Sequence, residues 1–172
     1  MFILVVEKIS KLIFPRPIAL VTTCNKEGKP NVASFSFATP ISFNPKYVCF
    51  AVAPERYTFN NLQEVREFVL NMVTEDMLKE VWVCGSESGR DVDKFKLTDL
   101  ETVPSVKVKP PRIKKCPVQL ECVVEFMEKF GDHYLVVGKV VAEHVETTQF
   151  KPILHYSGKE FYKVGEKVVY RE

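Results

Sequence analysis

The sequence predicts a mainly β protein: a closed or nearly closed antiparallel β-barrel with a few inserted helices at one side. Apolar and β-branched runs of strand length recur along the chain and are separated by turn residues. Helical patterns are short and grouped after the third strand, so strands do not alternate with long helices. No Gly-x-Gly-x-x-Gly sequence follows a strand, which argues against a doubly wound nucleotide-binding fold.

The first strands are predicted in the first third of the chain. Residues 18–23 form a β-branched run that ends in the turn residues 25–30. Residues 31–37 then form the return strand of a hairpin. Residues 47–53 are apolar on both faces, which predicts a strand in the centre of a sheet.

Three short helices are predicted in the middle of the chain. The pattern changes after Pro54 to a helix with Thr58 as its N-cap. A strand at residues 68–73 follows. Residues 74–85 predict a second helix with a hydroxyl cap at the start and a glycine at the end. Residues 91–97 predict a third.

The second half of the chain is again predicted to be β. Residues 106–109 alternate like a strand and are stopped by two prolines. Residues 117–127 and 134–145 are long strands joined by a Gly-Asp turn, which predicts a strong hairpin. Residues 161–164 and 167–170 predict a small final hairpin.

Composition favours one soluble globular domain spanning residues 1–172. The chain is 46% hydrophobic and 27% charged, and no repeat or linker divides it. Its net charge of +2 favours neither nucleic acid nor an anionic membrane as a partner. No apolar run reaches the roughly 20 residues of a membrane helix, and the apolar start is too short for a signal peptide. We therefore expect a cytoplasmic protein without a membrane partner.

The five cysteines predict buried thiols. Their number is odd and no Cys-x-x-Cys pair occurs, which favours neither a disulfide framework nor a metal site.

The strand at residues 31–37 interleaves small polar residues with aromatic ones. Ala33 and Phe35 share one face of this strand, while Ser34 and Ser36 share the other. The two serines, with Asn31 at the start of the strand, could hydrogen-bond the edge of a flat heterocycle. Alternatively, they are the wet face of an ordinary antiparallel strand.

The best candidate anion site lies at the start of the first predicted helix. A helix N-terminus offers free N–H groups, Thr58 adds a hydroxyl, and Arg56 adds a bidentate cation. The alternative is an exposed arginine beside an ordinary cap. Taken together with the strand at residues 31–37, the two features predict a ligand with a flat ring and a phosphate.

Two other features have simpler interpretations. Residues 107–115 carry five basic side chains, which are expected to form a solvated edge strand and loop but could attract phosphates or an acidic partner. Trp82 is expected to anchor its helix to the barrel, with a ligand-covering role as the alternative.

The order of several motifs resembles the flavin reductase-like FMN-binding proteins, the group that includes flavoredoxin. The segment Arg56-Tyr57-Thr58-Phe59-Asn60-Asn61-Leu62 is similar to that family's Lys-Asp-Thr-x-x-Asn-Ile, with arginine in place of lysine. The resemblance covers almost the whole chain. The other segments that carry it are residues 16–23, 31–37, 67–71, 93–95, 117–122, 131–133 and 152–156.

This resemblance implies a Greek-key split barrel, a homodimer, and FMN held near the subunit interface. It places residues 31–36 against the flavin ring or ribityl chain, and residues 56 and 58 at the phosphate. The cofactor-binding residues that it implies are Asn31, Ala33, Ser34, Phe35, Ser36, Arg56 and Thr58. It also places His133 and His155 near the side where NAD(P)H or a redox protein donates electrons.

The function that follows is that of an NAD(P)H:flavin oxidoreductase, which passes hydride from nicotinamide to FMN. Hydride transfer needs no general base, so no catalytic triad is assigned, and no metal is expected. Two alternatives stay open. One is an FMN-binding electron carrier without reductase activity of its own. The other is a barrel-type nucleic-acid-binding module that uses residues 107–115, against which the near-neutral net charge counts.

Overall fold

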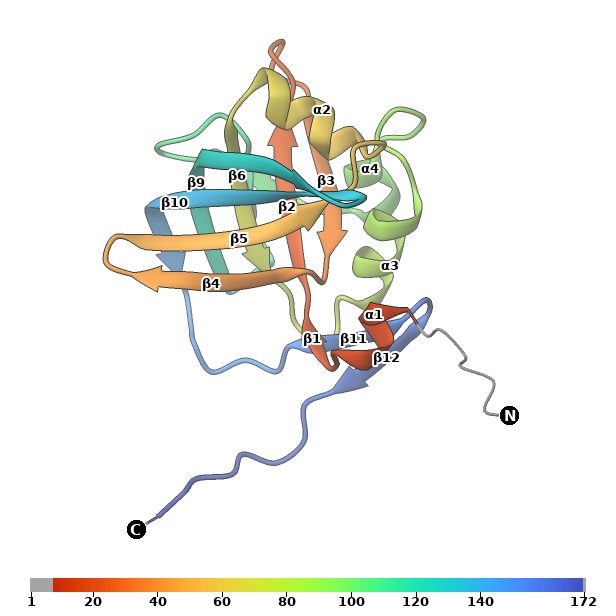
Figure 1. Ribbon diagram of the computed structural model, residues 1–172, viewed down its shortest axis with the longest axis vertical. Helices are drawn as coiled ribbons and strands as arrows, with labels where there is room; N and C mark the ends of the chain where they lie inside the picture. The colour runs from red at the N-terminus through yellow and green to blue at the C-terminus, as the bar shows by residue number, and fades with distance from the viewer. Residues whose placement is uncertain (1–7, 172) are drawn as a thin grey trace.

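A seven-stranded antiparallel sheet forms the body of the protein in the computed structural model, which describes residues 8–171 (Figure 1). The strand order is β3-β2-β6-β9-β10-β5-β4. Its strands are β2 (Ala19–Cys24), β3 (Pro30–Phe35), β4 (Ala38–Phe43), β5 (Lys46–Val52), β6 (Glu67–Met72), β9 (Val118–Phe130) and β10 (His133–Val145). The two edge strands, β3 and β4, are consecutive in the chain, and the N–H of Ala51 in β5 donates to the carbonyl of Phe37 in the short segment that joins them. The sheet is thus curled into a nearly closed barrel, which confirms the predicted fold class.

Smaller elements surround this barrel. The helices are α1 (Ile9–Leu12), α2 (Tyr57–Glu64), α3 (Leu78–Ser86) and α4 (Lys94–Thr98). A three-stranded sheet is formed by β1 (Arg16–Pro17), β11 (Ile153–Ser157) and β12 (Glu160–Lys163), and a two-stranded one by β7 (Thr102–Val103) and β8 (Arg112–Ile113). The first sheet brings β1, near the start of the described chain, against strands near its end, below the barrel in Figure 1.

One apolar cluster fills the barrel interior, and the long β9–β10 hairpin contributes side chains to it. Phe50 and Phe68 are fully buried and meet edge to face, with ring centroids 5.1 Å apart. Gly138 of β10 lies directly against Phe68, because a Cβ at this position would be 2.4 Å from its Cζ atom. A glycine is therefore needed here so that the phenylalanine ring can occupy the barrel.

A second apolar cluster lies on the outer face of β2 and β3, beneath α3. Leu20 and Val32 are fully buried there, together with Val81 of the helix. The hydroxyl of Ser34 donates to the carbonyl of Val81 at 2.6 Å. Helix α3 therefore covers part of this strand face, and Ser34 and Ser36 are half-buried.

Two helix starts differ from the predictions. Arg56, with extended backbone angles, is the N-cap of α2, so Thr58 lies inside the first turn instead of capping it. Thr58 is buried, and its hydroxyl is a partner of Asn31. Helix α3 begins at Leu78, because Thr74 is held in a β-bridge and its hydroxyl donates to Asp76.

Two predicted β segments also differ. Residues 106–109 form a loop because the N–H groups of Val106 and Lys107 bind the buried carboxylate of Glu121 instead of a strand partner. The final hairpin is formed by β11 and β12, not by residues 161–164 and 167–170 as predicted. Its turn contains Gly158, which has a φ of +55°. Residues 164–171 have no regular structure.

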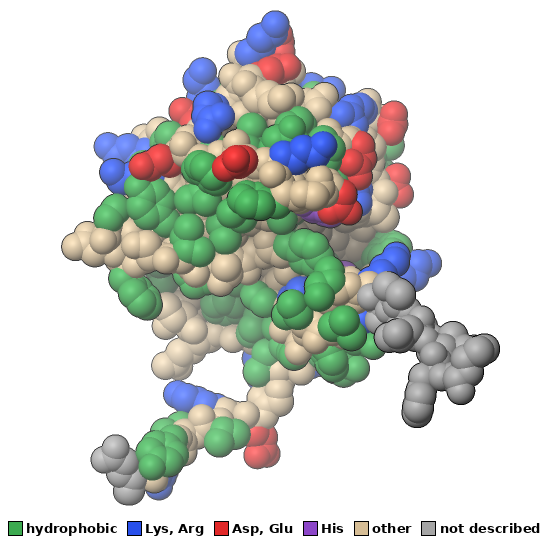
Figure 2. All heavy atoms as spheres, viewed as in Figure 1, with side chains coloured by type: hydrophobic (Ala, Val, Ile, Leu, Met, Phe, Trp, Pro, Cys, Tyr) green, Lys and Arg blue, Asp and Glu red, His purple; other side chains and the backbone are tan. Residues whose placement is uncertain are grey.

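The basic segment at residues 107–115 is largely neutralised. Lys114 lies 2.6 Å from a carboxylate oxygen of Glu101, and Lys115 reaches both Asp76 and Glu80. Figure 2 shows basic and acidic side chains interspersed over the upper part of the molecule. This pattern does not favour a nucleic-acid surface on residues 107–115.

The cysteines, the helices and the possible metal ligands among the described residues each bear on a prediction from the sequence. All five cysteines are buried and free, as predicted. Among residues 8–171, no helix is long and apolar enough to cross a membrane. In the same range, no three His, Cys, Asp or Glu side chains are grouped so that they could hold a metal ion.

The packing of Gly138 yields a prediction about stability. A Gly138→Ala variant should lose about 1–3 kcal/mol in free energy of unfolding, because the new methyl overlaps the fully buried Phe68 ring. Urea unfolding measures this loss. Gly165→Ala is the matched control: no atom lies within 4 Å of its added Cβ, so its stability should change by less than about 0.5 kcal/mol. Equal midpoints for the two variants would contradict the packing argument.

Candidate functional site

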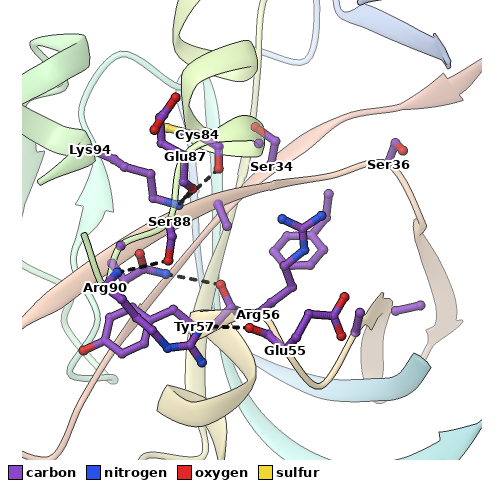
Figure 3. Close-up of a pocket in the computed structure, with 18 of the residues that line it drawn as sticks. Ser34, Ser36, Glu55, Arg56, Tyr57, Cys84, Glu87, Ser88, Arg90 and Lys94 are labelled. Carbon is purple, nitrogen blue, oxygen red and sulfur yellow. Dashed lines mark hydrogen bonds between the residues drawn. The ribbon is translucent and has the colours of Figure 1, made fainter. Parts of the chain in front are cut away.

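A cavity of about 420 Å³ opens between strand β3, the start of α2 and the loop from α3 to α4 (Figure 3). The seven residues predicted to bind a cofactor all line it: Asn31, Ala33, Ser34, Phe35, Ser36, Arg56 and Thr58. His133 lines the same cavity, whereas His155 lines a neighbouring one. The structure therefore brings the predicted binding residues together. Their contact with a ligand stays a prediction.

Asn31, in the wall of this cavity, connects β3 to α2. Its side-chain nitrogen donates to Thr58 Oγ1 at 3.2 Å, and both residues are almost fully buried. Its side-chain oxygen is also buried but has no hydrogen-bond partner among the described residues. A buried acceptor without a donor costs free energy. Asn31 therefore keeps one buried acceptor that no donor among the described residues satisfies.

The loop between α3 and α4 packs directly onto Asn31. A Cβ on Gly89 would lie 2.0 Å from the unpartnered oxygen of Asn31 and 3.0 Å from the ring of Tyr57. Only a glycine lets the backbone of this loop approach so closely. The loop thereby becomes a wall of the cavity opposite β3.

Arg56 projects into the cavity from the N-cap position of α2, as Figure 3 shows. Its side chain forms no hydrogen bond or ion pair with the other described residues. The adjacent Arg90 does have partners: it donates to the carbonyl of Glu55 at 2.8 Å and lies over the Tyr57 ring. Arg56 is therefore the arginine of this site that is available for an anion.

Lys94 is a third cation of the cavity, one to which the sequence reasoning gave no role. It extends from α4 and is almost fully buried, and its Nζ donates to the carbonyls of Cys84 at 3.1 Å and Glu87 at 3.3 Å (Figure 3). Burial is the main reason that the pKa of Lys94 is lowered to about 8, and the nearby positive charge of Arg56 contributes to this lowering. No carboxylate lies within ion-pair distance of its Nζ in residues 8–171.

Ser88 and Arg90, from the same loop, were also missed. The only local signals were the run of small residues before Arg90 and the acidic cap Asp93, whose side chain accepts from the N–H groups of Phe95 and Lys96. Neither signal says that the loop folds back over β3. The contact is long-range and depends on tertiary packing.

His155 belongs to a hydrogen-bonded cluster with Arg16 and Ser36. Its Nε2 lies 3.2 Å from the carbonyl of Gly158, which can only accept, so this nitrogen carries the proton. Its Nδ1 then accepts from Ser36 Oγ at 3.1 Å and from Arg16 at 3.4 Å. Burial lowers the pKa of His155, and the positive charge of Arg16 lowers it as well. The imidazole is therefore held neutral in one tautomer.

Arg16 is the residue that fixes this cluster in place. Its guanidinium is buried and donates to the carbonyls of Ser10, Ile13 and Tyr156. It thus joins α1 to β11, and its carbon Cζ lies 5.7 Å from the centre of the Phe37 ring.

His133 lies on the other side of the main cavity, at the tip of the β9–β10 hairpin. Its Nδ1 lies 2.8 Å from the carboxylate of Asp132, and this contact lowers the pKa of Asp132. Its ring is 5.8 Å from that of Phe37. His133 and His155 therefore have different hydrogen-bond partners and line different cavities.

The cysteine in the lining is not an activated nucleophile. Burial raises the pKa of the Cys84 thiol to about 12, so this cysteine is not a thiolate at neutral pH. What the cavity offers is a segment with alternating polar and apolar side chains, together with the cationic side chains of Arg56, Arg90 and Lys94. That combination suits binding and orientation of a flat ligand with an anionic group.

The comparisons with known proteins agree with this geometry. Residues 10–165 match the family model described as the flavin reductase like domain. An uncharacterized protein of Pyrococcus abyssi is 34% identical over 167 residues, which cover 92% of this chain and 95% of that protein. The crystal structure of flavoredoxin from Methanosarcina acetivorans is 26% identical and superimposes with a TM-score of 0.85, covering 99% of this chain and 94% of that one. Nitrilotriacetate monooxygenase component B from Bacillus cereus is also 26% identical, with a TM-score of 0.85 and coverage of 99% and 98%.

The cluster around His155 gives a prediction that needs no ligand. The pKa of His155 should lie below the ordinary 6.5, and its neutral form should carry the proton on Nε2, because burial and Arg16 disfavour the charged ring. A pH titration of the imidazole nitrogens by NMR measures both properties. A pKa above 6.5, or a proton on Nδ1, would contradict the arrangement.

Proposed function

Because the chain belongs to the flavin reductase-like family, we propose that its main cavity binds FMN and that the protein is an NAD(P)H:flavin oxidoreductase. Bound FMN would supply the redox chemistry, accepting a hydride from a nicotinamide. The protein's residues bind and orient the reactants. The main support for the proposal is that one cavity is lined both by the partly polar strand β3 and by the cationic residues Arg56 and Lys94.

The residues present fit a flavin mononucleotide. The segment from Ala33 to Ser36, at the end of β3, would lie along the flat ring. The unpartnered side-chain oxygen of Asn31 would accept from a ribityl hydroxyl, a group that can donate. A buried acceptor without a donor costs free energy, so the oxygen of Asn31 favours a ligand that has hydroxyl groups next to its ring.

The opposite end of the cavity suits a phosphate. Arg56 offers a guanidinium without other partners, Thr58 lies in the first turn of α2, and Lys94 adds a buried ammonium. Charge-assisted hydrogen bonds of this kind are among the strongest that proteins make. In α2 the positive end of the helix dipole also faces this region.

The donor side is proposed to include His133 and His155. Both lie in cavity walls, His133 beside Phe37 and His155 bonded to Ser36. Because hydride transfer needs no proton acceptor, neither is proposed as a general base. A neutral His155 would orient the Ser36 hydroxyl and keep a positive charge away from the ring.

We also propose a cytoplasmic homodimer. Buried free thiols are typical of a reducing compartment. Ile41 and Phe43 are 50% and 95% exposed on the edge strand β4, and Figure 2 shows hydrophobic side chains gathered over that side of the barrel. A second copy would cover them, and light scattering in solution should give twice the mass of one chain.

The second candidate function is an FMN-binding electron carrier that is reduced by another protein. Flavoredoxin from Methanosarcina acetivorans has the same fold and is 26% identical in sequence to this chain. This similarity favours the electron-carrier function. It uses the same cofactor site and differs only in the electron donor.

One anaerobic experiment separates the candidates. The protein reconstituted with FMN is mixed with NADH or NADPH in a stopped-flow instrument, and flavin absorbance is followed. The reductase predicts rapid bleaching with at least one donor. Bleaching with neither leaves the carrier, and failure to take up FMN contradicts both.

Replacement of Arg56 tests the phosphate site. Arg56→Ala should weaken FMN binding by about 1.5–3 kcal/mol, because a charge-assisted contact is lost. Titration of the apoprotein with FMN by flavin fluorescence gives the affinity. Arg66→Ala is the matched control, because Arg66 is exposed and does not line the cavity. Equal affinities for both variants would remove Arg56 from the site.

The pKa of Lys94 predicts how FMN affinity depends on pH. Well below about 8 the ammonium is charged in the free protein, so affinity should change little near pH 7 and begin to fall as the pH approaches about 8. Above that value the neutral amine must take up a proton to meet the phosphate dianion, so affinity should fall as pH rises. Lys94→Met should bind more weakly at about pH 7 and lack the decline. A wild-type affinity that stays constant to about pH 9 would contradict this role.

A further inference from the structure

Residues 104–111 form a closed loop, here called the strap, on the outer face of β6 and β9. The two ends of the strap are tied to each other. Arg112 donates to the carbonyl of Pro104 at 3.0 Å, and the hydroxyl of Ser105 donates to the carbonyl of Pro110 at 2.6 Å. Because its ends are joined, the strap can leave the barrel as one unit.

Two carboxylates hold the strap against the barrel. Glu121 of β9 accepts from the N–H groups of Val106 at 2.9 Å and Lys107 at 2.7 Å. Glu67 of β6 accepts from the N–H of Lys109 at 2.7 Å. Both acids point away from the barrel interior, because their neighbours along each strand belong to the interior cluster. The strap is thus bound by side-chain carboxylates, where a further strand would be bound by backbone carbonyls.

Glu121 is completely buried under the strap and uses both of its oxygens. His144 Nε2 of β10 lies 2.7 Å from Oε1, and Arg112 Nε lies 3.7 Å from the same oxygen. The N–H of Lys107 is bound by Oε2. Glu67 is on the same face of the sheet, diagonal to Glu121 in the pairing of β6 with β9. A proton on either oxygen of Glu121 would therefore displace one of these donors.

The pKa of Glu121 gives the direction of the effect of pH. Burial raises this pKa, but the N–H groups of the strap and the adjacent His144 together lower it by more, so it lies below the ordinary range of a glutamate. A lowered carboxyl pKa stabilises the folded form above the ordinary value, and this stabilisation is lost as the pH falls through the lowered value. The strap is therefore held closed at neutral pH and loses its charged partner only in acid.

Cys24 lies beside the strap at the end of β2. It shares the outer face of β2 with Thr22, whose hydroxyl donates to the last carbonyl of the strap. The thiol is 1% exposed. Its pKa is raised by burial and by the charge of Glu67, and is lowered to a smaller extent by Lys109 of the strap. Opening of the strap would thus uncover Cys24, whereas Cys122 would stay covered in the barrel interior.

We infer that the strap is an acid-sensitive device: the charged form of Glu121 holds it closed, and protonation of this carboxylate opens it as a unit and uncovers Cys24. The inference goes beyond the proposed function, because no residue of the strap and neither of its two carboxylates lines the main cavity. It requires no bound cofactor.

Thiol labelling at different pH values tests the device in the unmodified protein. 4,4′-Dithiodipyridine reacts with accessible thiols in acid as well as at neutral pH, and peptide mass spectrometry identifies the labelled cysteine. Relative to a free cysteine at the same pH, labelling of Cys24 should become at least about tenfold faster as the pH falls from about 6 to about 3, while Cys122 stays protected. Labelling of Cys24 that rises only together with that of Cys122 would overturn the inference, since the whole barrel would then be unfolding.

A neutral variant tests the same device at pH 7. In Glu121→Gln the amide nitrogen cannot accept, so the N–H groups of Val106 and Lys107 should exchange with deuterium about 10- to 100-fold faster, and Cys24 should be labelled faster. Glu125→Gln is the matched control: Glu125 is exposed on the same strand, is bonded elsewhere and should leave the exchange unchanged. Wild-type exchange in Glu121→Gln would contradict the inference. The labelling of the wild-type protein decides the question even where Glu121→Gln does not fold.

Discussion

The hydrogen bond from Asn31 to Thr58 is the contact on which the rest of the site depends. It ties strand β3 to the first turn of helix α2, so the two halves of the cavity have one fixed separation. Gly89 then brings the α3–α4 loop against the same asparagine. Because both Asn31 and Thr58 are almost fully buried, the bond is not weakened by competition with water. The side-chain oxygen of Asn31 remains without a partner among the described residues.

The placement of β3 between two apolar clusters makes this arrangement rigid. Phe35 packs into the barrel interior, while Val32 packs under α3 on the opposite face. Ser34 and Ser36 lie in this framework and are held by Val81 and His155. Polar groups at the cavity wall are therefore positioned by a strand that is covered on both sides, which suits precise binding better than a mobile loop would.

Much of the fold followed from local patterns, because alternation and turn residues report directly on strands. The β9–β10 hairpin and the β2–β3 hairpin are of this kind. Contacts between distant segments could not be predicted in the same way. The buried carboxylate of Glu121 turns a strand-like pattern at residues 106–109 into a loop, and Lys94 enters the cavity only because α4 folds back over β3. For the candidate site, the sequence identified the β3 and α2 sides, and the third wall emerged from tertiary structure.

The central claim is that one cavity holds the ring and the phosphate of FMN at its two ends. A crystal structure of the protein with FMN tests it most directly. The account predicts electron density for the phosphate at Arg56 and Thr58 and for the ring along Ala33 to Ser36. A flavin bound elsewhere on the protein, or one whose phosphate lies away from Arg56 and Thr58, would contradict it.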